Sequence, residues 1–318
     1  MPRRVPLPRE LFGTSFRTSE TAASGVGRQR LRSADVAHPF HGVSTVGLDL
    51  ESVIGLCRAY EPLLRHDQFF SHITAAALHG IPLPRSVGPL PLHISTVGEG
   101  AKTRRASVVG HVLSHADVAL AVGFPVLAPP LTWFHLSNLL QPNDLVAAGD
   151  FLITGARMAG GARSTALCSV EDLAVIVAAN TGNRGAVAAG WALPRLRMGV
   201  DSPRESWLRL VLAAGHFPEP QIGLAVIVDA GRQVLHPDLA LPEFRVVFEY
   251  EGEEHRTNRA RFRRDIRRRE LFEAANWRVL RVTADDLGPF VDQFLARVAE
   301  VLALREREKA HMGPSWNL

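Results

Sequence analysis

The sequence predicts a mixed α/β protein: a C-terminal mixed sheet flanked by helices, an α+β domain before it, and a small helical segment at the start. Three observations predict this class. The chain has 318 residues and 46% of them are apolar, which is too apolar for a disordered polypeptide and enough for two or three domains. Residues 46–165 alternate helical and strand patterns. Residues 200–307 predict the order helix, three strands, helix, strand, helix.

Composition excludes several classes of protein. Cys57 and Cys168 stand far apart, which argues against a disulfide scaffold and against a thiolate zinc site. The weakly polar stretch 118–133 contains three prolines, and the charges at the start of the chain are not followed by an apolar segment. We therefore expect neither export nor a membrane partner, and predict a cytoplasmic protein.

Residues 1–45 are polar and rich in arginine. The pattern from Ala22 to Arg32 has two glycines ahead of several arginines, which fits the turn and second helix of a degenerate helix-turn-helix unit. A solvated arm that packs one edge on the body fits the same residues. The sequence leaves both interpretations open.

Residues 46–167 predict an α+β domain. Ser71 can cap a helix that ends at Gly80, strands are expected at 92–97 and 108–113, and a further helical pattern opens at Thr132. The domain also contains several histidines: His72, His79, His93, His111 and His115. None has an i, i+4 partner on one helix face together with a carboxylate, so the pattern does not predict a catalytic zinc site.

Residues 168–198 predict a helical connector, and residues 199–308 a larger domain before a short tail at 309–318. The connector begins with a capping signal at Ser169. In the larger domain a helix is expected at about 203–214, with Ser202 as N-cap and Glu205 three residues later in a capping box. The capping box thus gives Glu205 a structural role, and a catalytic role is the alternative.

Three carboxylates are expected to lie close together on the sheet of this domain. In the strand 245–251 the period of two puts Glu249 and Glu251 on one face, and antiparallel pairing with the preceding strand brings Asp238 beside Glu249. Acids on one face repel each other unless a cation or basic groups neutralise them. The sequence predicts that they hold Mg²⁺ (or Mn²⁺), with a solvated polar face as the alternative.

A long helix rich in arginine is expected at about 257–275, followed by a strand at 277–283 parallel to the third strand and a closing helix at 286–307. The arginines of the helix are Arg259, Arg261, Arg263, Arg264, Arg267, Arg268 and Arg269. Such a run often marks a solvated face, but here it follows an acidic cluster, and a phosphate backbone is a partner that needs both. We predict DNA contacts by the residues Arg256, Arg261, Arg264 and Arg268.

Five motifs follow one another between residues 201 and 287. They are Ser202-Pro203-x-Glu205-Ser206-x-Leu208, Pro237-Asp238-Leu239-Ala240-x-Pro242-Glu243, Glu249-Tyr250-Glu251-Gly252-x-x-His255-Arg256, Asp265-x-x-Arg268, and Trp277-x-Val279-x-Arg281-Val282-Thr283-x-x-Asp286-Leu287. In this order they resemble the DUF559 family of small nucleases, relatives of the very-short-patch-repair endonuclease within the PD-(D/E)XK superfamily.

The resemblance implies roles for five residues. It assigns Asp238 and Glu249 to the metal, puts Glu251 in the third motif position where the family usually has aspartate, and places His255 where a histidine assists proton transfer. It makes Glu205 an ancillary residue of the same catalytic site, either at the metal or as part of its scaffold. The lysine of the superfamily's E-x-K signature is absent, as is common in DUF559 proteins.

An upstream region carries a second resemblance. Its motifs are Ser71-His72-x-Thr74-Ala75-Ala76-x-Leu78-x-Gly80-Ile81-Pro82, Val109-Gly110-His111, and Asp144-Leu145-Val146-Ala147-Ala148-Gly149-Asp150. They resemble actinobacterial AbiEi-like proteins, named for the antitoxin of a type IV toxin–antitoxin pair. The resemblance implies a DNA-binding unit ahead of the domain and a toxin partner protein.

We therefore expect a metal-dependent DNA endonuclease that acts in DNA repair or in defence against phage or plasmids. Two alternatives stay open. One is a non-catalytic DNA-binding or antitoxin-type regulator that retains a nuclease fold. The other is a domain whose acids only balance the arginine helix.

Overall fold

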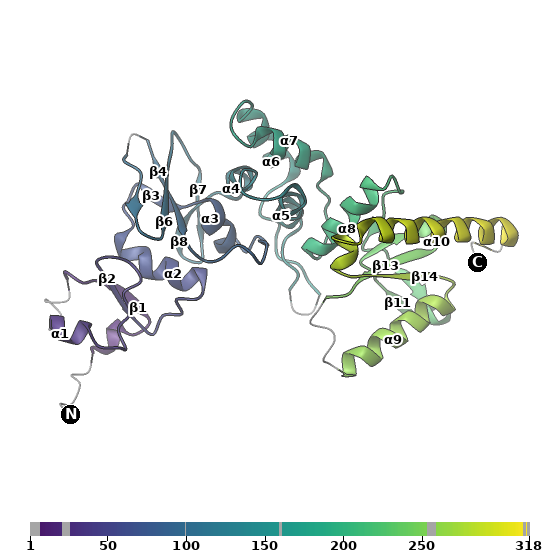
Figure 1. Ribbon diagram of the computed structural model, residues 1–318, viewed down its shortest axis with the longest axis horizontal. Coiled ribbons are helices and arrows are strands. Elements are labelled where there is room, and N and C mark those ends of the chain that lie inside the picture. The colour runs from purple at the N-terminus through teal and green to yellow at the C-terminus, as the bar shows by residue number, and fades with distance from the viewer. Residues whose placement is uncertain are drawn as a thin grey trace. The chain divides into compact units, whose positions relative to one another are not determined.

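The computed structural model describes residues 7–20, 26–98, 100–158, 161–252, 259–313 and 316, and for residues 28 and 259–263 the backbone alone. The described residues form ten α helices and four open sheets, so the predicted mixed α/β class is confirmed (Figure 1). The chain divides into two compact units. Unit 1 is Met1–Ala148 with Leu167–Leu193, and unit 2 is Gly149–Ala166 with Pro194–Leu318.

Unit 1 starts with a small two-stranded sheet. Strands β1 (Thr14–Arg17) and β2 (Val43–Val46) pair antiparallel, and the helix α1 (Arg28–Leu31) lies between them in the sequence. Leu31 and Val46 belong to the small apolar core of this part. The first half of the expected helix-turn-helix pattern lies outside the described residues, so that expectation stays a prediction.

The larger sheet of unit 1 has six strands in the order β5-β6-β4-β3-β8-β7. The strands are β3 (Gln68–Phe70), β4 (Leu92–Val97), β5 (Arg104–Arg105), β6 (Val108–Leu113), β7 (Val118–Ala121) and β8 (Phe124–Leu127). β4 runs parallel to β6, and β3 runs parallel to β8. Three helices contribute side chains to the apolar core of this sheet: α2 (Val53–Tyr60), α3 (His72–Leu78) and α4 (Pro129–Leu136). The strands expected at 92–97 and 108–113 are confirmed.

Three further helices follow in the chain: α5 (Pro142–Thr154), α6 (Val170–Ala179) and α7 (Ala186–Ala192). The capping box expected at Ser169 is present, because its hydroxyl accepts from the backbone of Asp172 and the Asp172 carboxylate accepts from the backbone of Ser169. None of the described helices is long and apolar enough to cross a membrane.

Unit 2 contains a four-stranded sheet in the order β14-β13-β12-β9. A separate pair, β10 and β11, forms a second sheet. From α8 onward the elements of unit 2 are α8 (Pro203–Ala214), β9 (Gln221–Ile222), β10 (Val226–Val228), β11 (Gln233–Leu235), β12 (Leu239–Leu241), β13 (Val246–Tyr250), α9 (Arg259–Ala274), β14 (Arg278–Val282) and α10 (Val291–Met312). β14 is parallel to β13, with α9 as the connection between them, as the sequence predicts.

The two strands expected at 221–228 and 233–239 are each broken in two. Gly223 has a φ of +65° between β9 and β10, a left-handed conformation that interrupts an extended strand. Pro237 lacks a backbone N–H and separates β11 from β12. As a result, the short β9 joins the main sheet while β10 and β11 form their own hairpin.

The strand β13 contributes apolar side chains to a different core on each of its two faces. Val246 and Phe248 belong to a core with α8 and α10, which contribute Leu208 and Phe294. Val247 belongs to a second core, together with residues of α9 and the β10–β11 hairpin. The predicted period of two is confirmed, and it places Glu249 on the α9 side of the sheet.

Candidate functional site: an acidic cleft in unit 2

A cleft of about 1120 Å³ lies at the end of the unit 2 sheet where β13 and β14 finish. Four of the acidic residues expected from the sequence line it: Glu205, Asp238, Glu249 and Glu251. They come from three elements that are separate in the chain, namely α8, the residue before β12, and the end of β13. The fold therefore brings together the acidic side chains that the sequence singles out.

Asp238 lies immediately before β12. The pairing of Leu239 with Phe248 places it at the level of Glu249, and its Oδ2 accepts a hydrogen bond of 2.7 Å from the backbone N–H of Tyr250. Burial raises the pKa of the Asp238 carboxyl, while this hydrogen bond and Arg268 act in the opposite direction. As expected from the sequence, Asp238 lies near Glu249.

Glu249 is half-buried and forms an ion pair with Arg268 of α9. Arg268 Nη2 lies 2.8 Å from Glu249 Oε1, and Arg268 Nε lies 3.2 Å from both carboxylate oxygens. Burial raises the pKa of Glu249; Arg268 lowers it, and the charges of Asp238 and Asp265 raise it further. Glu249 thus experiences two acidic neighbours and one basic one.

Glu251 follows β13 and points to a different partner. Its Oε1 lies 2.6 Å from Arg281 Nε, on the neighbouring strand β14. Both side chains are about 40% exposed, so solvent weakens this pair.

Glu205 occupies the third position of α8 and is 6% exposed. Its backbone N–H donates to the Ser202 hydroxyl, as expected for a capping box, but its side chain accepts from the backbone of Asp201 rather than of Ser202. Burial raises the pKa of Glu205 to about 7, and the charge of Asp238 adds to this shift. Glu205 is therefore both a helix cap and part of the cleft.

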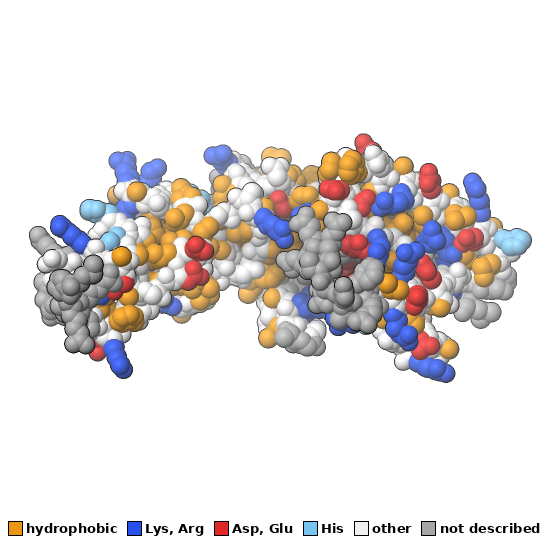
Figure 2. All heavy atoms as spheres, turned by 60° about the horizontal axis from the view of Figure 1, so that its bottom comes forward, with side chains coloured by type: hydrophobic (Ala, Val, Ile, Leu, Met, Phe, Trp, Pro, Cys, Tyr) orange, Lys and Arg blue, Asp and Glu red, His pale blue; other side chains and the backbone are white. Residues whose placement is uncertain are grey.

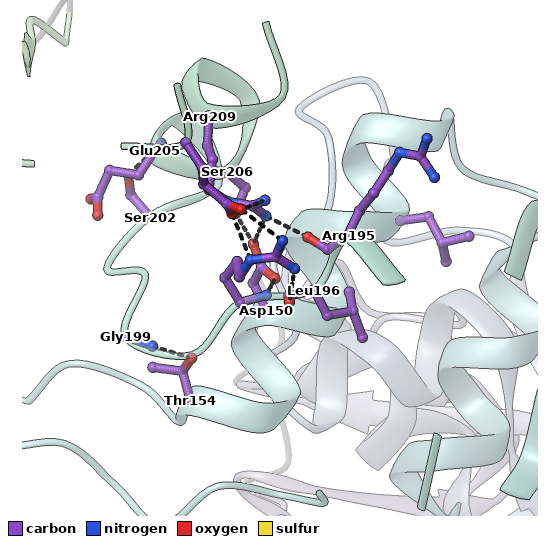
Figure 3. Close-up of polar contacts among 12 residues, drawn as sticks. Asp150, Thr154, Arg195, Leu196, Gly199, Ser202, Glu205, Ser206 and Arg209 are labelled. Atoms are coloured by element: carbon purple, nitrogen blue, oxygen red, sulfur yellow. Dashed lines mark hydrogen bonds and ion pairs between the residues drawn. The ribbon is translucent and has the colours of Figure 1, made fainter. Parts of the chain in front are cut away.

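A buried ionic network holds α8 behind Glu205 (Figure 3). Asp150 Oδ2 accepts from the Ser206 hydroxyl at 2.6 Å and from Arg209 Nη2 at 3.2 Å. Asp150 Oδ1 accepts from the backbone N–H of Arg197 at 2.6 Å, and Arg209 also donates to the carbonyl of Arg195. This network fixes the helix that carries Glu205.

The arginines expected to contact DNA have different positions. His255 and Arg256 lie outside the described residues, as does the side chain of Arg261. Arg264 is exposed, whereas Arg268 is turned toward Glu249 and lines the cleft.

Three further basic residues line the cleft: Arg204, Arg269 and Arg281. Arg269 belongs to the expected arginine-rich helix, but none of the three was predicted as a DNA contact. One signal was available for Arg281, because parallel pairing of the strands at 245–251 and 277–283 sets it opposite Glu249. In Figure 2, basic and acidic side chains are intermixed over the face of unit 2 that is turned to the viewer. The surface is mixed in charge rather than uniformly basic.

The acidic residues do not form a ready-made set of metal ligands. Among the described residues, the one group of three or more candidate ligand atoms that all lie within 4.8 Å of one another belongs to histidines of unit 1. The expected convergence of Asp238, Glu249 and Glu251 is therefore incomplete. Arg268 holds Glu249 and Arg281 holds Glu251, so the two carboxylates are directed toward arginines.

No family model matches the chain. It is 26% identical over 230 residues to two proteins of Mycobacterium tuberculosis, the uncharacterized protein Rv2248 of strain H37Rv and the uncharacterized protein MT2308 of strain CDC 1551. The matched region covers 72% of this chain and 79% of each relative. The chain is thus distantly similar to these mycobacterial proteins.

Proposed function

We propose that the protein is a metal-dependent DNA endonuclease that hydrolyses phosphodiester bonds in the acidic cleft of unit 2. One observation carries the proposal: Glu205, Asp238, Glu249 and Glu251, from separate parts of the chain, line a single cleft together with arginines. The same residues belong to the motifs that resemble the DUF559 family.

The chemistry of the donors fits a divalent cation. Glu205, Asp238 and Glu249 all have raised pKa values, chiefly because burial disfavours their charged forms, and Asp238 adds repulsion to the other two. A bound cation relieves this cost, and hard oxygen ligands suit Mg²⁺ or Mn²⁺. Asp238 and Glu249 would hold the ion, with Glu249 exchanging Arg268 for it. Such an ion, when bound, polarises a phosphoryl oxygen and lowers the pKa of a coordinated water.

The residues of the chain contribute positioning and charge. The backbone of Tyr250 fixes the Asp238 carboxylate, and the Asp150 network fixes the helix of Glu205. Arg268, once released from Glu249, and the neighbouring Arg269 would face a DNA phosphate at the cleft. During hydrolysis, a water gives up a proton to solvent or a nearby base as its oxygen forms a bond to phosphorus, the bond to one ester oxygen breaks, and that leaving oxygen takes up a proton from solvent.

A second candidate function is a non-catalytic DNA-binding or antitoxin-type regulator. The pairs Arg268–Glu249 and Arg281–Glu251 favour it, because they neutralise two of the acids without any cation. The upstream resemblance to AbiEi-like proteins supports it as well and brings a toxin as the expected partner.

The purified full chain on supercoiled, nicked and mismatched DNA separates the two candidates. The nuclease proposal predicts cleavage with Mg²⁺ or Mn²⁺ and none with EDTA. DNA binding without cleavage on every substrate and with both metals would contradict the nuclease and support the regulator.

A further inference from the structure

Four imidazole rings meet at one place in unit 1. The rings of His72 and His111 stack with centroids 3.7 Å apart, and the centroid of the His135 ring lies 4.5 Å from that of His72. The His93 ring lies 5.3 Å from that of His111 and 5.5 Å from that of His72. All four side chains are half-buried.

The fold of unit 1 brings these rings together from four elements. β4 and β6 are parallel with Ser95 opposite His111, so His93 and His111 lie on the same face of the sheet, one pleat apart. His72 is the first residue of α3, and His135 comes from the last turn of α4. The sequence spacing gives no sign of this meeting, because no two of the four share a helix.

The nitrogen atoms are spaced as ligands of one ion would be. Each of His72, His93 and His111 offers a nitrogen, and these three atoms all lie within 4.8 Å of one another. His93 Nδ1 and His111 Nε2 are 3.1 Å apart. Two nitrogens bound to one tetrahedral zinc ion, each about 2.0–2.1 Å from it, are about 3.3 Å apart. The His93–His111 pair therefore needs only a shift of a few tenths of an ångström, and His72 completes the group within 4.8 Å.

The rings are in the form that binds metals. Burial lowers the pKa of His72 to about 2 and those of His111 and His135 to about 4. Neighbouring histidines contribute to the low pKa of His72 and of His111. The imidazoles are thus neutral at pH 7, and each offers a lone pair. His135 Nδ1 is buried and has no hydrogen-bond partner.

His72 has an unfavourable backbone conformation, and its ring is fixed by a hydrogen bond. Its φ of +50° lies in the left-handed region, where residues other than glycine are uncommon. Its Nδ1 lies 3.0 Å from the hydroxyl of Ser71, which in turn accepts a hydrogen bond of 2.7 Å from Ser95. In the tautomer that donates Nδ1–H to Ser71, Nε2 is left to bind a metal, an arrangement typical of metal-ligating histidines.

We propose that unit 1 binds one divalent transition-metal ion, of the class represented by Zn²⁺, through His72, His93 and His111, with His135 beside them as a fourth nitrogen donor. Imidazole ligands select zinc and similar ions over Mg²⁺. Because His72 and His111 stack in parallel, one of these rings must turn edge-on toward the ion. The site is independent of the acidic cleft and of the nuclease proposal.

The test is a Zn²⁺ titration of the metal-stripped full chain by isothermal calorimetry, with the variants His93→Gln and His72→Asn. Asn tolerates the positive φ of residue 72, so this variant removes the ligand without adding backbone strain. The exposed His115→Gln is the matched control, and Asp238→Asn reports any Zn²⁺ that the acidic cleft holds instead. We expect one ion bound in unit 1 per wild-type chain, at least about tenfold weaker binding at that site for each ligand variant, and unchanged binding for His115→Gln.

A second readout does not depend on the variants. Co²⁺ bound by three or four nitrogens in a tetrahedral site gives a visible absorption band, and Zn²⁺ should abolish that band by displacing it. Failure of the wild-type chain to bind Zn²⁺, or binding that only Asp238→Asn weakens, would overturn the proposal.

Discussion

Replacement of Asp150 by Asn should destabilise unit 2 strongly, because it removes the one buried carboxylate that is paired with the buried Arg209 among the described residues. The side chains of Asp150 and Arg209 are 1% and 4% exposed, and their closest atoms are 3.2 Å apart. The amide of Asn keeps one acceptor for Arg197 N–H, but the group it turns toward Arg209 is a donor. Breaking a buried pair by removing one partner costs about 3–5 kcal/mol. Arg209 would keep its bond to the carbonyl of Arg195 and the exposed Glu219 at 3.8 Å, while its buried Nε has no hydrogen-bond partner.

Urea unfolding followed by far-UV circular dichroism and by tryptophan fluorescence measures this cost, with the transitions of the two units fitted separately. The matched control is Glu219→Gln, since Glu219 contacts the same Arg209 at 3.8 Å but is 51% exposed. A surface partner of this kind contributes about 0–1 kcal/mol. Equal effects of the two substitutions would refute the argument that burial makes the Asp150 pair decisive.

Three further predictions concern the cleft. Glu205 has an ordinary pKa of 4.5 that is raised to about 7, so its stabilising contribution is present below pH 4.5 and is lost as the pH rises through 7. Glu205→Gln should therefore be more stable than wild type at pH 8 by roughly 2–4 kcal/mol in thermal unfolding, and parallel pH curves would count against the shift. Replacement of Arg261, Arg264 and Arg268 by Gln should weaken DNA binding for all sequences and flatten the salt dependence by roughly one unit of log-log slope per lost phosphate contact, whereas unchanged filter binding would make this helix a solvated face. Glu251→Asp should retain or raise the cleavage rate, and a large loss would mean that the site is fitted to the longer side chain.

Much of unit 2 could be predicted because its signals are local. The cap and proline at the start, and Gly215 at the end, predicted a helix at about 203–214, which is confirmed as α8. The alternation in β13 predicted which faces its side chains occupy. Both depend on the period of a single element, which the sequence displays directly.

The features of the site that the sequence did not predict depend on contacts between elements. That Arg268 turns inward to Glu249 while Arg264 stays exposed follows from how α9 packs on the sheet, which no period reveals. The histidine cluster was missed for a related reason: His93 and His111 become neighbours only through the parallel register of β4 and β6. No pattern in the sequence singles out His135.

The central claim, that the acidic cleft holds the cation for DNA hydrolysis, is tested most directly by one comparison of cleavage rates. Wild type, Asp238→Asn and the exposed control Glu300→Gln are assayed on supercoiled DNA with Mg²⁺, with DNA affinity measured in parallel. We predict that Asp238→Asn cleaves at least about a hundredfold more slowly while it still folds and binds DNA, because the substitution removes a charged ligand with little change in volume. Glu300→Gln should match wild type. Equal rates for Asp238→Asn and wild type, or a wild-type protein that binds DNA without cutting it, would contradict the claim.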